Sequence, residues 1–195
     1  MPCKAPESTA FQTQTMALGD LTDELQALRL CEPEYLLFNP SGDKAWLRES
    51  FNSIPRYLIR VSTLNSDGTT DRIWVKSKDA RYASANGRVD ILAKDDNQQV
   101  AGTLNRHLRW WGKPTDPDNL VSWTSSLLFA FQYIFYRHNH SRDRSSLDRI
   151  DLCIVDTATF PEGVFLPDMD LIYAYRSFDE NLRDLEDLRR KNCKQ

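Results

Sequence analysis

The chain has 195 residues, of which 41% are hydrophobic, so it is long and apolar enough for one domain with a real core. Its formal net charge of −3 gives no positive field for a phosphate backbone, which argues against a nucleic-acid partner. The first residues lack the apolar stretch of a secretory signal, and the longest apolar run, residues 127–131, is far shorter than a membrane span. We therefore expect a soluble protein of the reduced cytoplasm or nucleus, with a protein or small-molecule partner and no membrane partner.

The first part of the chain predicts a tail, two helices and two strands. Residues 1–19 are polar without periodicity and are expected to form a mobile tail, with a single domain over residues 20–195. Leucines at helical spacing predict a helix that ends before Pro33, and a second short helix is expected at residues 44–51. Residues 56–62 alternate as a strand that carries Arg60, and residues 73–75 are a second short apolar run.

The middle of the chain predicts an amphipathic helix followed by a strand–helix corner. In residues 97–111, Val100, Leu104 and Leu108 form one apolar stripe. Residues 120–124 read as a short strand that runs into a helix at 125–137. That helix is apolar on almost every side, which predicts that it is central and buried, and the Ser and Thr residues at the corner suit its N-cap.

The last part predicts a buried strand at residues 150–156 and a further strand candidate at 171–175. A final helix is expected from about residue 178, with Ser177 and Glu180 as a capping box. Helices and strands mix without strict alternation, which favours the α+β class. The expected architecture is a split, mostly antiparallel sheet around the buried helix, with residues 97–111 and 179–192 as a helical layer.

No metal cofactor is predicted. The four cysteines lie far apart, and His-Asn-His at residues 138–140 is interpreted as a solvated helix end. Sequence motifs for phosphate loops, dinucleotide folds and zinc proteases are absent. The basic and aromatic residues 106–111 could stack bases, but the overall acidity favours arginines lying over tryptophans at a helix end.

Several strings in the chain resemble an uncharacterised domain family of filamentous fungi. These strings are YLIRV, IWVKS, NLVSWTSSLLFAFQY, DLCIVDTATFPEGVF and DLIYAYRSFDENL, and together they extend over roughly residues 55–190. The string around SWTSS is the most specific of them. This resemblance implies a source for the protein and no activity.

A remoter resemblance bears on chemistry. A strand with Arg, a helical insertion, a Ser- and Thr-rich strand, and a helix with a small residue follow in the order found in ADP-ribosyltransferases of the Arg/Ser/Glu class, which include enterotoxin-like enzymes. The resemblance implies an ADP-ribosyltransferase-like fold and NAD as substrate. It implies that Arg60 binds NAD phosphate and that Ser122, Thr124 and Ser125 brace the nicotinamide pocket. Ala130 matches the small helical residue, and His107 loosely matches a histidine on the intervening helix.

The same resemblance calls for a catalytic glutamate, because a carboxylate beside the ribose stabilises the positive charge that develops when nicotinamide leaves. It should lie on a strand after residues 150–156. Glu162 lies in a Pro-Glu-Gly turn and is the catalytic candidate, while Glu180 and Glu186 fall on the last helix. Either Glu162 is this catalytic carboxylate, or the chain is a shortened member of the family that lacks it. Alternatively, Arg60 simply pairs with an acid, and the serines only cap a helix.

Three functions remain as alternatives. The first is an ADP-ribosyltransferase-like fungal module, which as an enzyme would be an NAD-dependent ADP-ribosyltransferase or NAD glycohydrolase. The second is a non-catalytic interaction or accessory protein of a fungal secondary-metabolite or stress pathway. It predicts an exposed apolar patch and no pocket at Ser122. The third is a hydrolase with Ser125 or Ser126 within hydrogen-bond reach of His107 or His138.

Overall fold

The computed structural model describes residues 35–113, 115–139 and 144–192. The chain divides into two compact units, residues 1–35 and residues 36–195, and every helix and strand that the structure describes belongs to the second unit. The expected tail over residues 1–19 and the helix expected before Pro33 lie outside the described residues.

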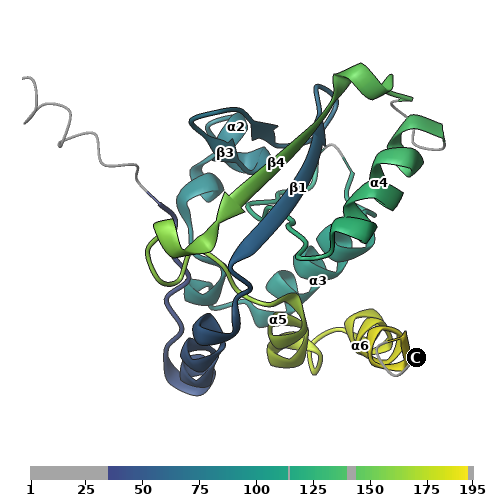
Figure 1. The fold of residues 1–195 in the computed structure, drawn as a ribbon. Coiled ribbons are helices and arrows are strands. Elements are labelled where there is room, and N and C mark those ends of the chain that lie inside the picture. The colour runs from purple at the N-terminus through teal and green to yellow at the C-terminus, as the bar shows by residue number, and fades with distance from the viewer. Residues whose placement is uncertain (1–34, 114, 140–143, 193–195) are drawn as a thin grey trace, which may run out of the picture. The chain divides into compact units, whose positions relative to one another are not determined.

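Two small antiparallel sheets form the β structure (Figure 1). Strand β1 (Tyr57–Thr63) pairs with β4 (Ile150–Asp156), with Arg60 opposite Cys153. Strands β2 (Thr69–Thr70) and β3 (Val75–Lys76) pair as a short hairpin. The strand expected at residues 120–124 is reduced to one bridge, in which Thr124 pairs with Ile59 on the edge of β1. The strands expected at residues 56–62 and 150–156 are confirmed.

Helices supply most of the core. The longer ones are η1 (Gly42–Ser53), α3 (Asn97–Arg109), α4 (Leu127–Asn139), α5 (Asp168–Tyr175) and α6 (Glu180–Asn192). The short ones are α2 (Lys78–Arg81), η2 (Ala85–Arg88), η3 (Ile91–Ala93), η4 (Leu147–Arg149) and η5 (Thr157–Thr159). The core cluster consists of Leu47, Ile91, Leu92, Val100, Ala101, Leu104, Leu171, Ile172, Tyr175, Leu182 and Leu185. The mixed α+β class is confirmed, and the core lies among η1, η3, α3, α5 and α6.

The prediction that helix α4 is central and buried is wrong. Of its residues only Ala130 is buried, and the helix has β1 as its main neighbour. Leu128 and Phe135 are 69% and 58% exposed. A helix that is apolar all round offers no preferred face, and a sheet of two strands can cover only one side of it. None of the described helices is both long and apolar enough to cross a membrane.

The strand β4 is also less buried than its apolar sequence predicts. Leu152 and Ile154 are exposed, while Cys153 between them is half-buried. One face of the strand is therefore open. The reason is that the two-stranded sheet has a covering layer on one side only, and burial on both faces needs elements packed against each of them.

The strand candidate at residues 171–175 is a helix, α5. Pro167 stands at its N-cap, and Asp168 and Asp170 lie in its first turn, where carboxylates interact favourably with the helix dipole. Leu171 and Tyr175 lie one turn apart and are both buried in the core. A short apolar run fits either period, and these start signals decide in favour of the helix.

The predicted capping box of the last helix is wrong in its cap residue. Helix α6 begins at Glu180, and the backbone N–H of Leu182 donates to Asp179 Oδ1 at 3.2 Å. Asp179 therefore performs the role assigned to Ser177, which is exposed. Aspartate and serine accept about equally well from the free N–H groups of a first helical turn, so the sequence alone does not distinguish Asp179 from Ser177 as the cap.

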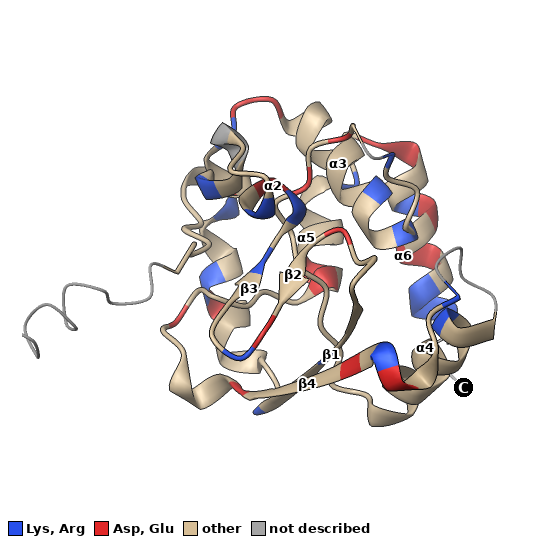
Figure 2. Ribbon diagram, turned by 90° about the horizontal axis from the view of Figure 1, so that it is seen from above, with Lys and Arg blue, Asp and Glu red and all other residues tan. Residues whose placement is uncertain are grey.

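Helix α6 also buries a carboxylate. Figure 2 shows that this helix carries both acidic and basic residues, and among them the Glu186 side chain is only 1% exposed. It accepts from Arg176 Nη1 at 2.8 Å and from Arg190 Nε at 2.8 Å. Burial alone raises the pKa of Glu186, but the hydrogen bonds and charges of the two arginines outweigh burial and leave this pKa below its ordinary value.

Leu104 and Leu128 give a matched test of where the core lies. Leu104→Ala should lower the free energy of unfolding by about 2–5 kcal/mol, because it empties a buried site. Leu128→Ala should change it by less than about 0.5 kcal/mol, because that side chain already contacts solvent. Urea unfolding followed by tryptophan fluorescence measures both. A larger loss for Leu128→Ala would contradict the placement of the core.

Glu186→Gln should lower the free energy of unfolding at pH 7 by about 2 kcal/mol, because charged hydrogen bonds are lost. A carboxylate whose pKa is depressed on folding stabilises the protein above its unfolded pKa, and this contribution disappears as the pH falls through the folded pKa. The two proteins should therefore converge in acid. Glu49→Gln, at an exposed site, is the control and should leave the pH profile unchanged. A constant difference from pH 7 to pH 3 would contradict the ion pairs.

Candidate functional site

Arg60 lies near the middle of β1, and its guanidinium connects three segments. Its Nε donates to Thr70 Oγ1 of β2 at 2.8 Å, and its Nη1 donates to the backbone oxygen of Ser122 at 3.1 Å. The second Nη makes no hydrogen bond to a described residue. Arg60 therefore connects β1 to the hairpin on one side and to the segment before α4 on the other.

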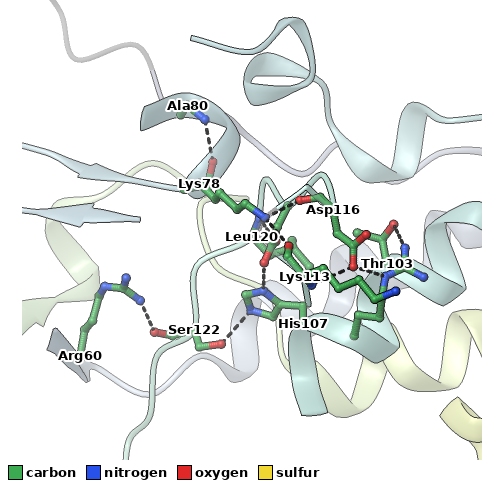
Figure 3. A network of polar contacts seen from close by, with 12 residues as sticks. Arg60, Lys78, Ala80, Thr103, His107, Lys113, Asp116, Leu120 and Ser122 are labelled. Atoms are coloured by element: carbon green, nitrogen blue, oxygen red, sulfur yellow. Dashed lines mark hydrogen bonds and ion pairs between the residues drawn. The ribbon is translucent and has the colours of Figure 1, made fainter. Parts of the chain in front are cut away.

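Ser122 also contacts a histidine from helix α3 (Figure 3). His107, in the last turn of α3, has its Nε2 2.7 Å from Ser122 Oγ and its Nδ1 2.6 Å from Asp118 Oδ2. The His107 and Asp118 side chains are 13% and 23% exposed, and Ser122 is exposed. Asp118, His107 and Ser122 thus form a continuous chain of hydrogen bonds that ends at an exposed residue. We call these three residues the relay.

The direction of the hydrogen bonds in the relay follows from the carboxylate. An ionised carboxylate only accepts, so Nδ1 of His107 carries the hydrogen and donates to Asp118. In the neutral imidazole Nε2 is then the acceptor, and the Ser122 hydroxyl donates to it. Asp118 therefore selects the histidine tautomer that can take a proton from Ser122.

The loop that carries Asp118 is held in several places. Asp118 Oδ1 accepts from the Leu120 N–H at 2.9 Å, and the Asp118 backbone oxygen accepts from Asp79 N–H at 3.0 Å. Lys78 Nζ donates to the backbone oxygens of Lys113 and Asp116 at 2.8 and 2.6 Å (Figure 3). An Asp that bonds the N–H two residues on is a common turn device. The start of α2 and the local turn together fix the Asp118 carboxylate.

The remaining predicted site residues at the corner serve the start of α4. Thr124 pairs through its backbone with Ile59, and its Oγ1 accepts from Ser126 N–H at 3.1 Å. Ser126 Oγ accepts from Phe129 N–H at 3.2 Å, which is an N-cap bond and confirms the predicted capping role of the corner. Ser125 is exposed. Ala130, the small residue of the resemblance, is fully buried.

Glu162 lies apart from this cluster. It is exposed in the turn between η5 and α5, and the next residue, Gly163, packs near Leu37 and Phe51 and accepts from the Phe38 N–H at 2.8 Å. No hydrogen bond or ion pair joins Glu162 to Arg60 or Ser122 among the described residues. The carboxylate that the geometry does bring to Ser122 is Asp118, through His107.

Charge and burial act on Arg60 together. Burial lowers its pKa from the ordinary value, while Tyr133, Cys153 and Asp118 act in the opposite direction. Burial likewise raises the pKa of the half-buried Cys153 thiol, which the Arg60 charge opposes. A guanidinium stays protonated in proteins, so Arg60 is a fixed positive charge beside Ser122.

Sequence reasoning paired the wrong serines with the histidines. The expected partners were Ser125 or Ser126 with His107 or His138, but His107 contacts Ser122, and His138 Nδ1 lies 3.0 Å from the Ser145 backbone oxygen. Sequence reasoning also missed Asp118, whose signal was the Asp-Pro-Asp turn directly before the serine-rich corner. No cluster of metal-ligating residues occurs in the described part of the chain.

A small cavity lies beside α3 and does not include Ser122. It is lined by Ile91, Lys94, Gln99, Val100, Thr103, Leu104 and Leu120. Leu120 connects it to the relay loop, but the relay itself opens to the surface. A ligand at Ser122 would therefore be bound at an exposed site and not in this cavity.

Comparisons with known proteins identify a family and no activity. A family model described as a domain of unknown function, DUF7587, matches residues 53–185. No curated protein and no solved structure shows a significant match to the chain. The matched residues include Arg60, His107, Asp118 and Ser122, so the whole cluster lies within the family's domain.

Gly68 tests how the hairpin supports Arg60. A Cβ at this position would collide with the Lys76 backbone oxygen and stand 3.5 Å from Arg60 Nη2. Gly68→Ala should therefore cost about 1–3 kcal/mol of stability, as overpacking does. Gly112→Ala is the control, because nothing lies within 4 Å of its Cβ position. Thermal unfolding measures both, and equal melting temperatures for the two variants would contradict this contact.

Proposed function

The chain belongs to the DUF7587 family, a family of unknown function, and within it we propose that this protein is an NAD-binding module related to the ADP-ribosyltransferases. One observation carries the proposal. Arg60, His107 and Ser122 lie 47 and 15 residues apart in the sequence (107 − 60 and 122 − 107), yet they meet through two hydrogen bonds at Ser122. The resemblance assigns Arg60 and Ser122 to the NAD site, and His107 loosely matches a histidine on the intervening helix.

The chemistry of these residues suits a dinucleotide. Arg60 supplies a permanent positive charge, and its Nη2 makes no hydrogen bond to a described residue. Charged hydrogen bonds to phosphate are among the strong ones. Ser122 is exposed, and its hydroxyl can contact the amide of a nicotinamide ring. NAD bound here would supply a reactive nicotinamide–ribose bond, while the protein residues would hold and orient it.

Transfer of ADP-ribose is expected to be weak or absent. That reaction needs a free carboxylate beside the ribose, and Asp118 already accepts from His107 and from Leu120 N–H. Glu162 lies in a turn that packs against residues 37, 38 and 51. We therefore propose binding of NAD as the activity of the site, with group transfer impaired.

Thermal unfolding with NAD tests this function. NAD at a hundred times its dissociation constant adds about 2.7 kcal/mol of stability, which for a domain of this size raises the melting temperature by roughly 5–10 °C. Arg60→Ala should abolish the shift, since it removes the phosphate contact. Arg56→Ala is the matched control, because Arg56 flanks the same strand but pairs with Asp156 at the surface.

The comparison is between melting temperatures with and without NAD for each variant, so a lower basal stability of Arg60→Ala does not disturb it. Nicotinamide release, followed by chromatography, should stay at the level of the buffer. No shift at 10 mM NAD in the folded wild type, or an undiminished shift in Arg60→Ala, would refute NAD binding. Rapid nicotinamide release would refute the impairment.

A non-catalytic interaction protein is the second candidate, and the exposed face of α4 favours it. Leu127, Leu128, Phe129, Phe131, Phe135 and Tyr136 are all between 45% and 69% exposed. Contiguous apolar surface of this kind is typical of interaction sites. The NAD experiment separates the two candidates, because an interaction surface on α4 gives no NAD response that depends on Arg60.

A further inference from the structure

The relay has a geometry that NAD binding does not require. The distances from Asp118 Oδ2 to His107 Nδ1 and from His107 Nε2 to Ser122 Oγ are 2.6 and 2.7 Å. Both are within the range for a base in contact with its nucleophile and for a base held by an acid. The order carboxylate, imidazole, hydroxyl is that of a catalytic triad, which is recognised by geometry and not by chain position.

Burial divides the relay in the way a nucleophilic site needs. The His107 and Asp118 side chains are largely buried, at 13% and 23% exposure, so water competes little for their hydrogen bond. Ser122 is exposed and can meet a substrate. A relay that only fixed the loop would not need an exposed serine at its end, because a buried serine would make the same hydrogen bond.

Two hydrogen-bond donors lie close to Ser122 along the chain or across it. The Trp123 N–H makes no hydrogen bond within the part of the chain that the structure describes, and it directly follows Ser122. In serine hydrolases with a nucleophile elbow, the N–H after the serine is one of the two that stabilise the oxyanion. Arg60 donates to the Ser122 backbone oxygen at 3.1 Å, so its fixed positive charge lies beside the Ser122 backbone and favours negative charge that develops at this residue.

We propose that Ser122 is a nucleophile activated by His107 and Asp118, and that the protein hydrolyses small carboxylic esters through an acyl-Ser122 intermediate. Ser122 Oγ forms a bond to the carbonyl carbon while its proton passes to His107 Nε2. The bond from that carbon to the leaving oxygen then breaks, and Nε2–H protonates the alcohol. In the second half-reaction, water attacks the acyl carbon and gives a proton to His107 Nε2. The bond from that carbon to Ser122 Oγ then breaks, the carboxylic acid leaves, and Nε2–H returns its proton to Oγ.

The position of Ser122 selects the substrate class. Ser122 is an exposed residue outside the cavity beside α3, so a long acyl chain would stay in water and gain little. The positive charge of Arg60 stabilises an oxyanion and so favours acyl transfer over reactions that develop positive charge on the substrate. Short acyl esters therefore fit the site best, and their hydrolysis needs no NAD.

A fluorophosphonate probe tests the proposal on the full chain, in the absence of NAD. Such a probe phosphonylates only an activated serine, and mass spectrometry of the peptides locates the adduct. Wild type should be labelled at Ser122, and Ser122→Ala should lose the label. His107→Gln and Asp118→Asn should label about 10²–10⁴ times more slowly, because each removes the base or its correct tautomer. Hydrolysis of p-nitrophenyl acetate should likewise be lost in Ser122→Ala and slowed in His107→Gln and Asp118→Asn.

Two controls match the relay residues in type. Ser177→Ala removes an exposed serine that lies outside the relay, and His138→Gln removes a histidine whose Nδ1 contacts a backbone oxygen. Both should be labelled at the wild-type rate. Circular dichroism of every variant shows whether it folds, and labelling of wild type in 8 M urea gives the rate of an unassembled serine.

The possible outcomes are distinct. Label at Ser122 in native wild type, lost in urea and slowed in folded relay variants, supports the proposal. Native wild type that labels no faster than in urea overturns it, whatever the variants do, and so does an adduct on another residue. Folded His107→Gln with the wild-type rate also overturns it. None of these results depends on the NAD experiment, so each function can fail alone.

Discussion

Two backbone hydrogen bonds between Ile59 and Thr124 position the segment that carries Ser122. Ile59 N–H donates to the Thr124 backbone oxygen at 2.7 Å, and Thr124 N–H donates back at 2.9 Å. This single bridge attaches the segment before α4 to the free edge of β1, and thereby sets the Ser122 backbone oxygen within reach of Arg60. It also fixes where α4 starts, since Thr124 and Ser126 form the turn that begins the helix.

Sequence reasoning located the secondary-structure elements around the site better than it predicted the contacts between them. The strand with Arg60, the helix with His107 and the capped corner after Ser122 follow from local periodicity and turn chemistry, which are short-range properties. The contact of His107 with Ser122 and Asp118 depends on how a loop folds back on α3, and no periodicity encodes that. The prediction that Arg60 and Ser122 share a site rested on a resemblance. In the structure, their contact depends on the bridge between Ile59 and Thr124.

Burial was predicted least well, and for one reason. Apolar content was taken as a measure of burial, which made the helix expected at residues 125–137 the centre of the fold. The structure instead fills its core from the more polar helices, α3 and α6, each of which has one apolar face. A helix with a single apolar face can be packed by a few neighbours, whereas α4 would need neighbours on every side, and β1 supplies only one.

The relay and Arg60 differ in how far apart their partners lie along the chain. His107 and Ser122 close a loop of 15 residues, whereas Arg60 must come from 62 residues away to meet Ser122. The entropy of loop closure makes the longer contact harder to form by about 1.3 kcal/mol. Contacts of short range tend to form early in folding. We therefore expect the histidine–serine contact to form earlier in folding than the contact between Arg60 and Ser122, so that the positive charge joins the site only when the sheet closes.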